Sequence, residues 1–215
     1  MKKTGMIQEN DRILFIGDSI TDVGRSRNFD GDLGNGFPFL LAAELLHRYP
    51  KSNLNILNRG VSGDTLAQLK NRWEEDCLDL SPDLVTILIG VNDVWKSFEQ
   101  NTTPSGEELE MFEKNYRYLL KSLAQRTDAK VVLMEPFLLP YPKDRIEWRK
   151  QLDPRIQIVR RVAKDYHAIL VPLDGLLNAA GIVSDYQTYT GIDGVHPTLT
   201  GHAQIAKAWL DYVDN

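Results

Sequence analysis

The sequence predicts a single doubly wound α/β domain, in which a parallel β-sheet lies between two layers of helices. Five short runs of apolar residues occur along the 215-residue chain, and four of them are followed closely by Gly or Pro. Amphipathic helical patterns separate these runs, and no linker, internal repeat or low-complexity tract interrupts the alternation. Apolar strands that alternate with helices are typical of a parallel sheet covered on both faces.

The expected strands are the apolar runs themselves. They consist almost entirely of apolar residues, with Asn55 and Thr86 as the exceptions. Each run can therefore be buried on both faces of a sheet. In order along the chain, the expected strands are residues 13–16, 54–57, 84–89, 131–134 and 168–171.

Helices are expected between and after the strands because apolar residues recur there at three- and four-residue spacing. Ser105 and Glu108 fit a capping box that opens the third of these helices. The Asp153-Pro154 pair is expected to open the fourth. The expected helices cover residues 37–46, 66–77, 109–123, 153–166 and 199–212.

Composition excludes several classes of protein. The chain has 25 Lys and Arg against 30 Asp and Glu, a net charge of −5, and no long basic run, so a nucleic-acid partner is not expected. Its single cysteine, Cys77, excludes an intramolecular disulfide and a cysteine-based zinc site. Residues 1–11 are polar and the apolar runs are too short to cross a bilayer. We therefore expect a cytoplasmic protein with no membrane partner.

Small and polar residues follow the first three expected strands, at the edge where sheets of this kind bind ligands. Ser19, Gly60 and Asn92 lie there, one after each strand. Near the C-terminus, Asp193 precedes His196 by three residues, so its carboxylate can orient the imidazole toward a serine hydroxyl. This set suits acyl transfer, with Ser19 as the nucleophile and His196 as the base. The Ser19 N–H, the Gly60 N–H and the Asn92 amide would stabilise the oxyanion.

Together these segments resemble the four sequence blocks of the SGNH, or GDSL-type, hydrolases. Ile20 stands where that family usually has leucine. The resemblance implies a flavodoxin-like, three-layer α/β/α fold with five parallel strands, a single hydrolase domain over residues 1–215, and neither a metal nor a cofactor. It also implies the same roles for the serine, histidine, aspartate and three oxyanion donors. The blocks, in the family's order, are Gly17-Asp18-Ser19, Asn58-Arg59-Gly60, Gly90-Val91-Asn92-Asp93 and Asp193-Gly194-Val195-His196-Pro197.

Within that family, residues 73–76 (WEED) and 91–95 (VNDVW) look closest to bacterial acetylxylan esterases. This similarity implies a serine esterase that removes acetyl or other short acyl groups from carbohydrates such as xylo-oligosaccharides, and it is compatible with a homo-oligomer. Trp95, Tyr186 and Tyr189 are candidate substrate contacts, although aromatic residues in such places are as often part of the packing.

Other interpretations remain open at this point. A lysophospholipase or thioesterase would use the same catalytic residues, and a flavodoxin-like binding module could keep the fold without catalysis. Residues 17–22 (GDSITD) superficially suggest a two-metal phosphoesterase, but such sites need several imidazoles and the chain has four histidines in all. The glycine-rich segment 31–36 follows no expected strand, which disfavours a dinucleotide site.

Overall fold

The structure, a computed structural model, describes residues 6–99 and 105–214. Its centre is a five-stranded sheet in the order β2-β1-β3-β4-β5, in which every neighbouring pair is parallel. This arrangement confirms the predicted fold class. The strands agree with the expected runs to within a few residues at each end: β1 (Arg12–Gly17), β2 (Asn55–Gly60), β3 (Leu84–Leu88), β4 (Lys130–Met134) and β5 (Ile169–Val171).

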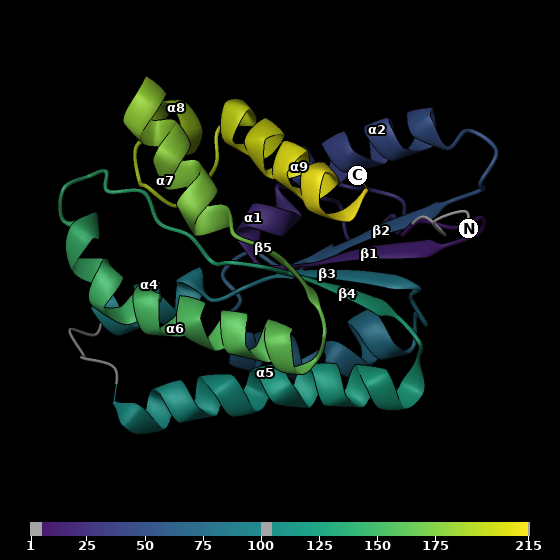
Figure 1. Ribbon diagram of the computed structural model, residues 1–215, viewed down its shortest axis with the longest axis horizontal. Helices are drawn as coiled ribbons and strands as arrows, with labels where there is room; N and C mark the ends of the chain where they lie inside the picture. Colours follow the sequence, from purple (N-terminus) through teal and green to yellow (C-terminus); the bar gives the residue numbers. More distant parts are fainter. Residues whose placement is uncertain (1–5, 100–104, 215) are drawn as a thin grey trace.

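Helices cover both faces of the sheet, and the molecule therefore has three layers (Figure 1). On one face lie α1 (Ser19–Asp22), α2 (Phe37–Arg48), α7 (Leu173–Ser184), α8 (Gln187–Thr190) and α9 (Leu199–Val213). On the other lie α3 (Leu66–Asn71), the π-helical turn η1 (Glu74–Leu78), α4 (Val91–Glu99), α5 (Gly106–Arg126) and α6 (Arg145–Asp165).

The side chains of β1 show how the sheet joins the two layers. Ile13 and Phe15 belong to the core beneath α2 and α9, whereas Leu14 and Ile16 belong to the core above α3 and α5. All four side chains are completely buried. Burying a side chain of this size contributes about 1.5–3 kcal/mol, so both faces of the central strand stabilise the fold.

Two predicted helices have different bounds in the structure. Helix α6 begins at Arg145 rather than at Asp153, and Pro154 lies inside it. Trp148 and Leu152, in the first half of the helix, are buried in the core. Their burial offsets the cost of about 3 kcal/mol for an interior proline. The stripe predicted as one helix over 66–77 is divided between α3 and η1.

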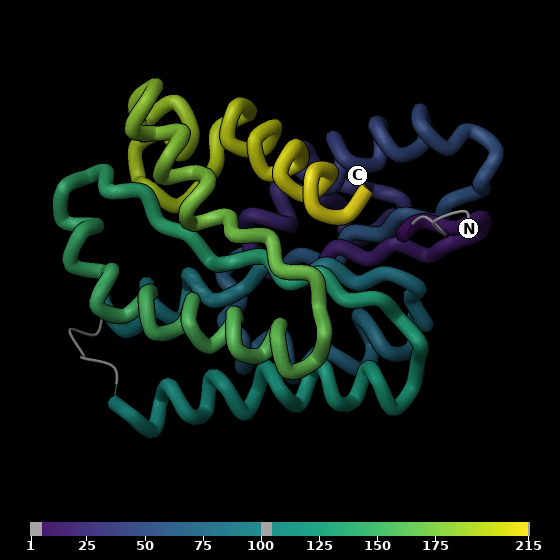
Figure 2. Tube along the Cα trace, viewed as in Figure 1, coloured from purple at the N-terminus to yellow at the C-terminus, as the bar shows by residue number. Residues whose placement is uncertain are grey.

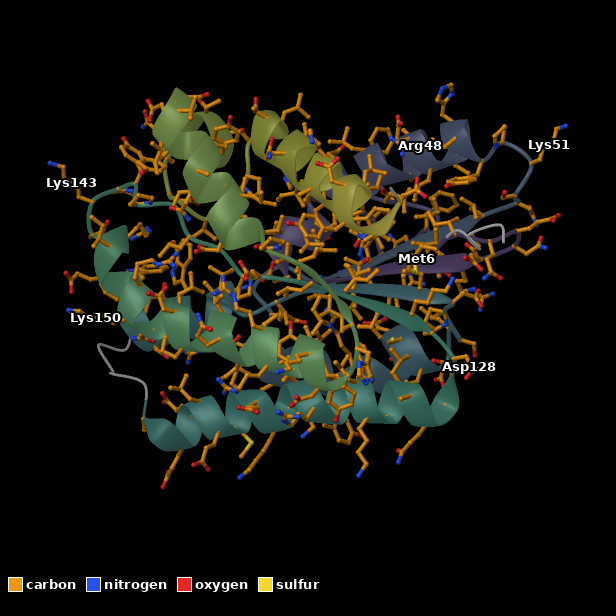
Figure 3. All side chains as sticks on the ribbon, viewed as in Figure 1. Met6, Arg48, Lys51, Asp128, Lys143 and Lys150 are labelled. Carbon is orange, nitrogen blue, oxygen red and sulfur yellow. The ribbon has the colours of Figure 1, made fainter. Side chains whose placement is uncertain are left out.

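The strands all run from one end of the molecule to the other. Lys51 and Asp128, which precede β2 and β4, lie at one end, and Lys143 and Lys150, which follow β4, lie at the opposite end (Figure 3). The tube in Figure 2 shows that the chain returns through a helical crossover between strands. The carboxyl ends of the strands therefore meet at one edge. No helix in the two described stretches is both long and apolar enough to cross a membrane.

Candidate active site

Ser19 lies directly beyond the carboxyl end of β1, where the chain turns from strand to helix. Glycine is required at position 17, just before this turn, because a Cβ atom there would lie 2.1 Å from the Leu88 carbonyl oxygen of β3. The Asp18 side chain caps α1 by accepting a hydrogen bond of 3.0 Å from the Ile20 N–H. Ser19 is thus the first residue of α1, and its own N–H has no acceptor among the described residues.

His196 is held next to Ser19 by a second loop, which leads into α9. The Ser19 Oγ lies 3.0 Å from His196 Nε2, and His196 Nδ1 lies 2.6 Å from Asp193 Oδ2. The other oxygen, Asp193 Oδ1, accepts hydrogen bonds of 2.9 Å from the N–H groups of Val195 and His196. The structure therefore brings together the serine, histidine and aspartate that the sequence singles out, in the order needed for proton transfer.

The loop that carries Asp193 is fixed from the protein side. Gly194 has φ +75°, and a Cβ atom there would lie 2.2 Å from the Tyr141 carbonyl oxygen, so only glycine fits. The Gly194 carbonyl accepts a hydrogen bond from the Leu139 N–H, and the Asp193 carbonyl accepts one of 2.8 Å from Arg145 Nε. Helix α6 begins earlier than the sequence predicts, and its first residue, Arg145, thus holds the loop that carries Asp193.

The pKa values of this pair are shifted in opposite directions. The hydrogen bond with Asp193 raises the pKa of His196, although burial opposes the shift. For Asp193, burial raises the pKa, but the hydrogen bonds from His196 and Val195 together lower it below its usual value. The aspartate therefore stays ionised and stabilises a positive charge on the imidazole.

The expected oxyanion donors do not all face the site. Asn92, in the first turn of α4, lines the cavity beside Ser19, and its Nδ2 uses one hydrogen to donate to the Asp64 carbonyl at 3.0 Å. The other hydrogen remains for a ligand. The Gly60 N–H, however, donates to Asn58 Oδ1 at 2.8 Å in the buried interior. The structure therefore corrects the expectation for Gly60, whose N–H is already occupied by a protein acceptor.

Gly63 lies where the expected donor is missing. It lines the same cavity as Ser19 and Asn92, and its N–H has no acceptor within residues 6–99 and 105–214. Its φ of +84° is a conformation that favours glycine. The signal in the sequence is the second glycine of the segment Gly60-Val61-Ser62-Gly63.

The cavity at this edge has a volume of about 610 Å³. Of the three candidate aromatic contacts, only Trp95 lines it, with its ring centroid 6.0 Å from that of His196. Tyr186, the N-cap of α8, and Tyr189, within α8, instead pack against the core, and neither lines the cavity. The remaining lining residues are Val23, Gly24, Ser62, Lys96, Glu99, Pro197 and His202.

His202 contributes a second imidazole to the cavity wall. Burial lowers its pKa to about 4, and its Nδ1 accepts a hydrogen bond of 3.2 Å from the Phe37 N–H. The neutral ring therefore carries its proton on Nε2. Because its side chain is only 4% exposed and stacks on Phe37, His202 packs in the cavity wall rather than acting as a base.

Comparisons with known proteins agree with this geometry. The GDSL-like lipase/acylhydrolase family matches residues 15–204 of the chain. An acetylxylan esterase from Geobacillus stearothermophilus is 33% identical over 211 residues, which cover 95% of this chain and 94% of that protein. A crystal structure of an acetylxylan esterase from the same organism superposes with a TM-score of 0.85 at 31% identity, covering 97% and 96% of the two chains. Solved catalytic mutants of that esterase carry alanine in place of a serine or an aspartate.

A second solved structure is similar to the same extent. An α/β hydrolase enzyme from the metagenome of Lake Arreo, Spain, has a TM-score of 0.86 and 31% identity, with 97% of each chain covered. Among curated relatives, an acetylxylan esterase from Xylanibacter ruminicola is 29% identical over 91% of this chain, although the match spans only 42% of that longer protein.

Proposed function

The chain belongs to the GDSL-like lipase/acylhydrolase family and is a carboxylic ester hydrolase; from this premise we propose that it is a serine esterase that removes acetyl groups from carbohydrates such as xylo-oligosaccharides. The observation that carries the proposal is the chain of contacts from Ser19 through His196 to Asp193 on the wall of an open cavity. The similarity to two acetylxylan esterases supports the acetylated carbohydrate as substrate.

In the first half of the proposed reaction, the acetyl group moves from the sugar to the enzyme. His196 Nε2, 3.0 Å from the serine oxygen, takes the proton as Ser19 Oγ attacks the acetyl carbonyl carbon. The resulting imidazolium is stabilised by the ionised Asp193 at Nδ1. When the tetrahedral intermediate collapses, His196 gives its proton to the departing sugar oxygen, which leaves acetyl-Ser19.

In the second half, water replaces the sugar. His196 takes a proton from a water molecule, whose oxygen attacks the acetyl carbon, and acetate leaves as the proton returns to Ser19 Oγ. In both halves the negative oxygen of the intermediate needs donors. We assign these to the N–H groups of Ser19 and Gly63 and to the Asn92 amide, because each has a hydrogen without a protein acceptor in the described residues.

The test is a substrate series with a matched pair of serine variants. We expect the wild-type enzyme to hydrolyse acetylated xylobiose, and to prefer p-nitrophenyl acetate to the octanoate. Ser19→Ala should lose on the order of 10³-fold or more in kcat/KM on both acetyl substrates. Ser184→Ala, which changes an exposed serine of α7, is the control and should keep full activity.

Other outcomes would favour the alternatives. A preference for octanoate over acetate would overturn the carbohydrate assignment and favour a lysophospholipase or thioesterase. Labelling of Ser19 by a phosphonate probe offers an independent check on the nucleophile. If the folded wild-type protein failed to react with the probe, the proposed esterase mechanism would be wrong and a binding module would be favoured.

A further inference from the structure

A second cavity, of about 520 Å³, lies behind the loops that form the active site. The two cavities are lined by neighbouring residues of the same two segments. Val23 and Gly24 face the first cavity and Arg25 the second, while Ser62 and Gly63 face the first and Val61 the second. Four arginines line the second cavity, together with three acidic residues: Arg25, Arg27, Arg59 and Arg72 with Asp30, Glu75 and Asp76.

Arg25 is the unusual member of this group, because it is buried and yet incompletely paired. Its side chain is only 7% exposed. Its Nε donates to the Gly60 carbonyl at 3.0 Å, but neither terminal amino group has an acceptor in the described part of the chain. Both terminal amino groups are open to solvent: fully buried atoms without a partner occur in this structure, and the Arg25 amino groups do not belong to them. The guanidinium therefore presents free donors to the cavity.

The nearest carboxylate neutralises this charge only in part. Asp22 Oδ1 lies 4.0 Å from Arg25 Nε, beyond hydrogen-bond distance, and the other oxygen, Oδ2, accepts hydrogen bonds from the N–H and the hydroxyl of Ser62. Burial lowers the pKa of Arg25; Asp22 opposes this shift, whereas Arg59 and Arg27 reinforce it. Positive charge thus accumulates at a place where a buried ion normally has a close partner.

Arg72, which lines the same cavity, differs from Arg25 because its guanidinium donors have protein acceptors. It donates to Asp64 at 2.7 Å, to Asp76 at 2.8 Å, and to the carbonyls of Gly17 and Arg59. These contacts tie α3 to the ends of β1 and β2, so Arg72 has a structural role. Arg25 has only one such contact, although it is also largely buried.

None of the three acidic residues on the cavity wall pairs with Arg25. Asp30 accepts from Arg59 at 2.9 Å, and Asp76 is engaged by Arg72 and lies 3.8 Å from Arg59. Glu75 is exposed and forms no ion pair with any residue the structure describes. It is therefore the one wall carboxylate available to compete with an anionic ligand.

We propose that Arg25, with Arg27 and Arg59 beside it, forms an anion site that takes the carboxylate or phosphate group of a sugar. The planar fork of a guanidinium matches two oxygens of either group. The inference deepens the proposed function and rests on it in one respect: the anionic sugar is a residue of the same acylated oligosaccharide. The same two loops line both cavities, which makes the anion site a neighbour of the active site.

A binding experiment tests the anion site without using esterase activity. By calorimetry, sodium glucuronate and inorganic phosphate are titrated into the wild-type enzyme, with glucose as the neutral reference. We expect at least one anion to bind and glucose not to. Arg25→Gln, which keeps a donor for the Gly60 carbonyl, should abolish binding, and Arg27→Gln should weaken it about 10-fold, by the loss of one charged contact. Glu75→Gln should strengthen it.

Controls and outcomes separate the sources of the anion. Arg161→Gln, an exposed arginine of α6, should bind the anions like wild type. Binding of glucuronate identifies an acidic sugar, and binding of phosphate alone identifies a phosphorylated one. If neither anion binds, or if Arg27→Gln binds as tightly as wild type, the anion site is overturned. Arg27 is exposed and has no protein acceptor in the described chain, so this variant is informative even if Arg25→Gln does not fold.

A kinetic experiment tests whether the anion belongs to the substrate. Two acetylated xylo-oligosaccharides are compared, one neutral and one bearing a uronic acid. We expect the wild type to favour the acidic one about 10-fold in kcat/KM, and Arg27→Gln to lose this preference without a change on p-nitrophenyl acetate. Equal rates on both sugars, together with glucuronate binding, would refute the link to the substrate and leave the proposed esterase function intact.

Discussion

Replacing Asp193 by Asn is expected to harm catalysis more than replacing it by Ala. Asp193 Oδ1 accepts from the N–H groups of Val195 and His196, so an Asn would place its own oxygen there and turn its NH₂ group toward His196 Nδ1. Nδ1 would then have to accept, and the neutral imidazole would carry its proton on Nε2. In that tautomer, His196 cannot take the proton of Ser19.

The two substitutions should therefore differ in magnitude. The wrong tautomer is expected to cost about 10³–10⁴-fold in kcat. An Ala leaves Nδ1 to water, because the His196 side chain is 49% exposed, and the productive tautomer stays populated. Ala also removes the acceptor of the Val195 and His196 N–H groups. The direct loss to the transition state is one charge-assisted hydrogen bond to the imidazolium, about 1.5–3 kcal/mol when shielded and about 1–2 kcal/mol with solvent screening. That corresponds to a loss of about 5–30-fold.

The assay is kcat and kcat/KM for p-nitrophenyl acetate between about pH 5 and pH 9. His196 must be neutral to act as a base, and its hydrogen bond with Asp193 raises its pKa. The wild-type rate should therefore rise with pH through a pKa above the usual range for histidine. In Asp193→Ala the pH at which the rate rises should be lower, because the hydrogen bond that raises the pKa of His196 is lost. The tautomer argument is refuted if Asp193→Asn is more active than Asp193→Ala. The assigned cause of the His196 pKa shift is refuted if the rate of Asp193→Ala rises at the same pH as that of the wild type.

Three further predictions concern single residues. Asn92→Ala should lower kcat about 10²–10³-fold with little change in KM, and steady-state rates within twofold of wild type would contradict its role as an oxyanion donor. Burial raises the pKa of Asp18 to about 7, so the folded protein keeps a proton that the unfolded chain releases above about pH 4. Relative to Asp18→Asn, the wild type should thus lose up to about 4 kcal/mol of stability as pH rises from about 4 to 7; urea unfolding curves that keep a constant difference would contradict this. The Cys77 thiol is buried and burial raises its pKa, so it should react with a disulfide reagent only after unfolding, and rapid labelling of the native protein at about pH 8 would show otherwise.

Local signals in the sequence were enough for the fold class. Runs such as residues 84–89 are apolar throughout, which a strand needs when helices cover both of its faces. The capping box at Ser105 marks the start of α5 correctly, because its hydrogen bonds involve only residues three positions apart. The pair Asp193 and His196 belongs to the same class of signal, since only two loop residues separate them.

Features that depend on distant contacts could not be predicted in this way. Helix α6 continues through Pro154 because Trp148 is buried against residues remote in sequence, such as Trp95, whose ring centroid lies 5.1 Å away. Tyr186 fills the space over Gly181 on α7 rather than the active site. Neither outcome is encoded in the periodicity of the segment itself.

The sequence by itself thus determined the alternation of strands and helices, the expectation of a site at the carboxyl edge of the sheet, and Ser19, Asp193 and His196 as its candidates. Only the tertiary structure decided which groups still have hydrogens to offer. The Gly60 N–H is taken by Asn58, while Gly63 and the terminal groups of Arg25 are left without a protein acceptor in the described residues. The physical reason is that a sequence motif identifies which residues carry N–H donors, whereas the acceptor that each N–H meets depends on the direction in which it points in the folded chain.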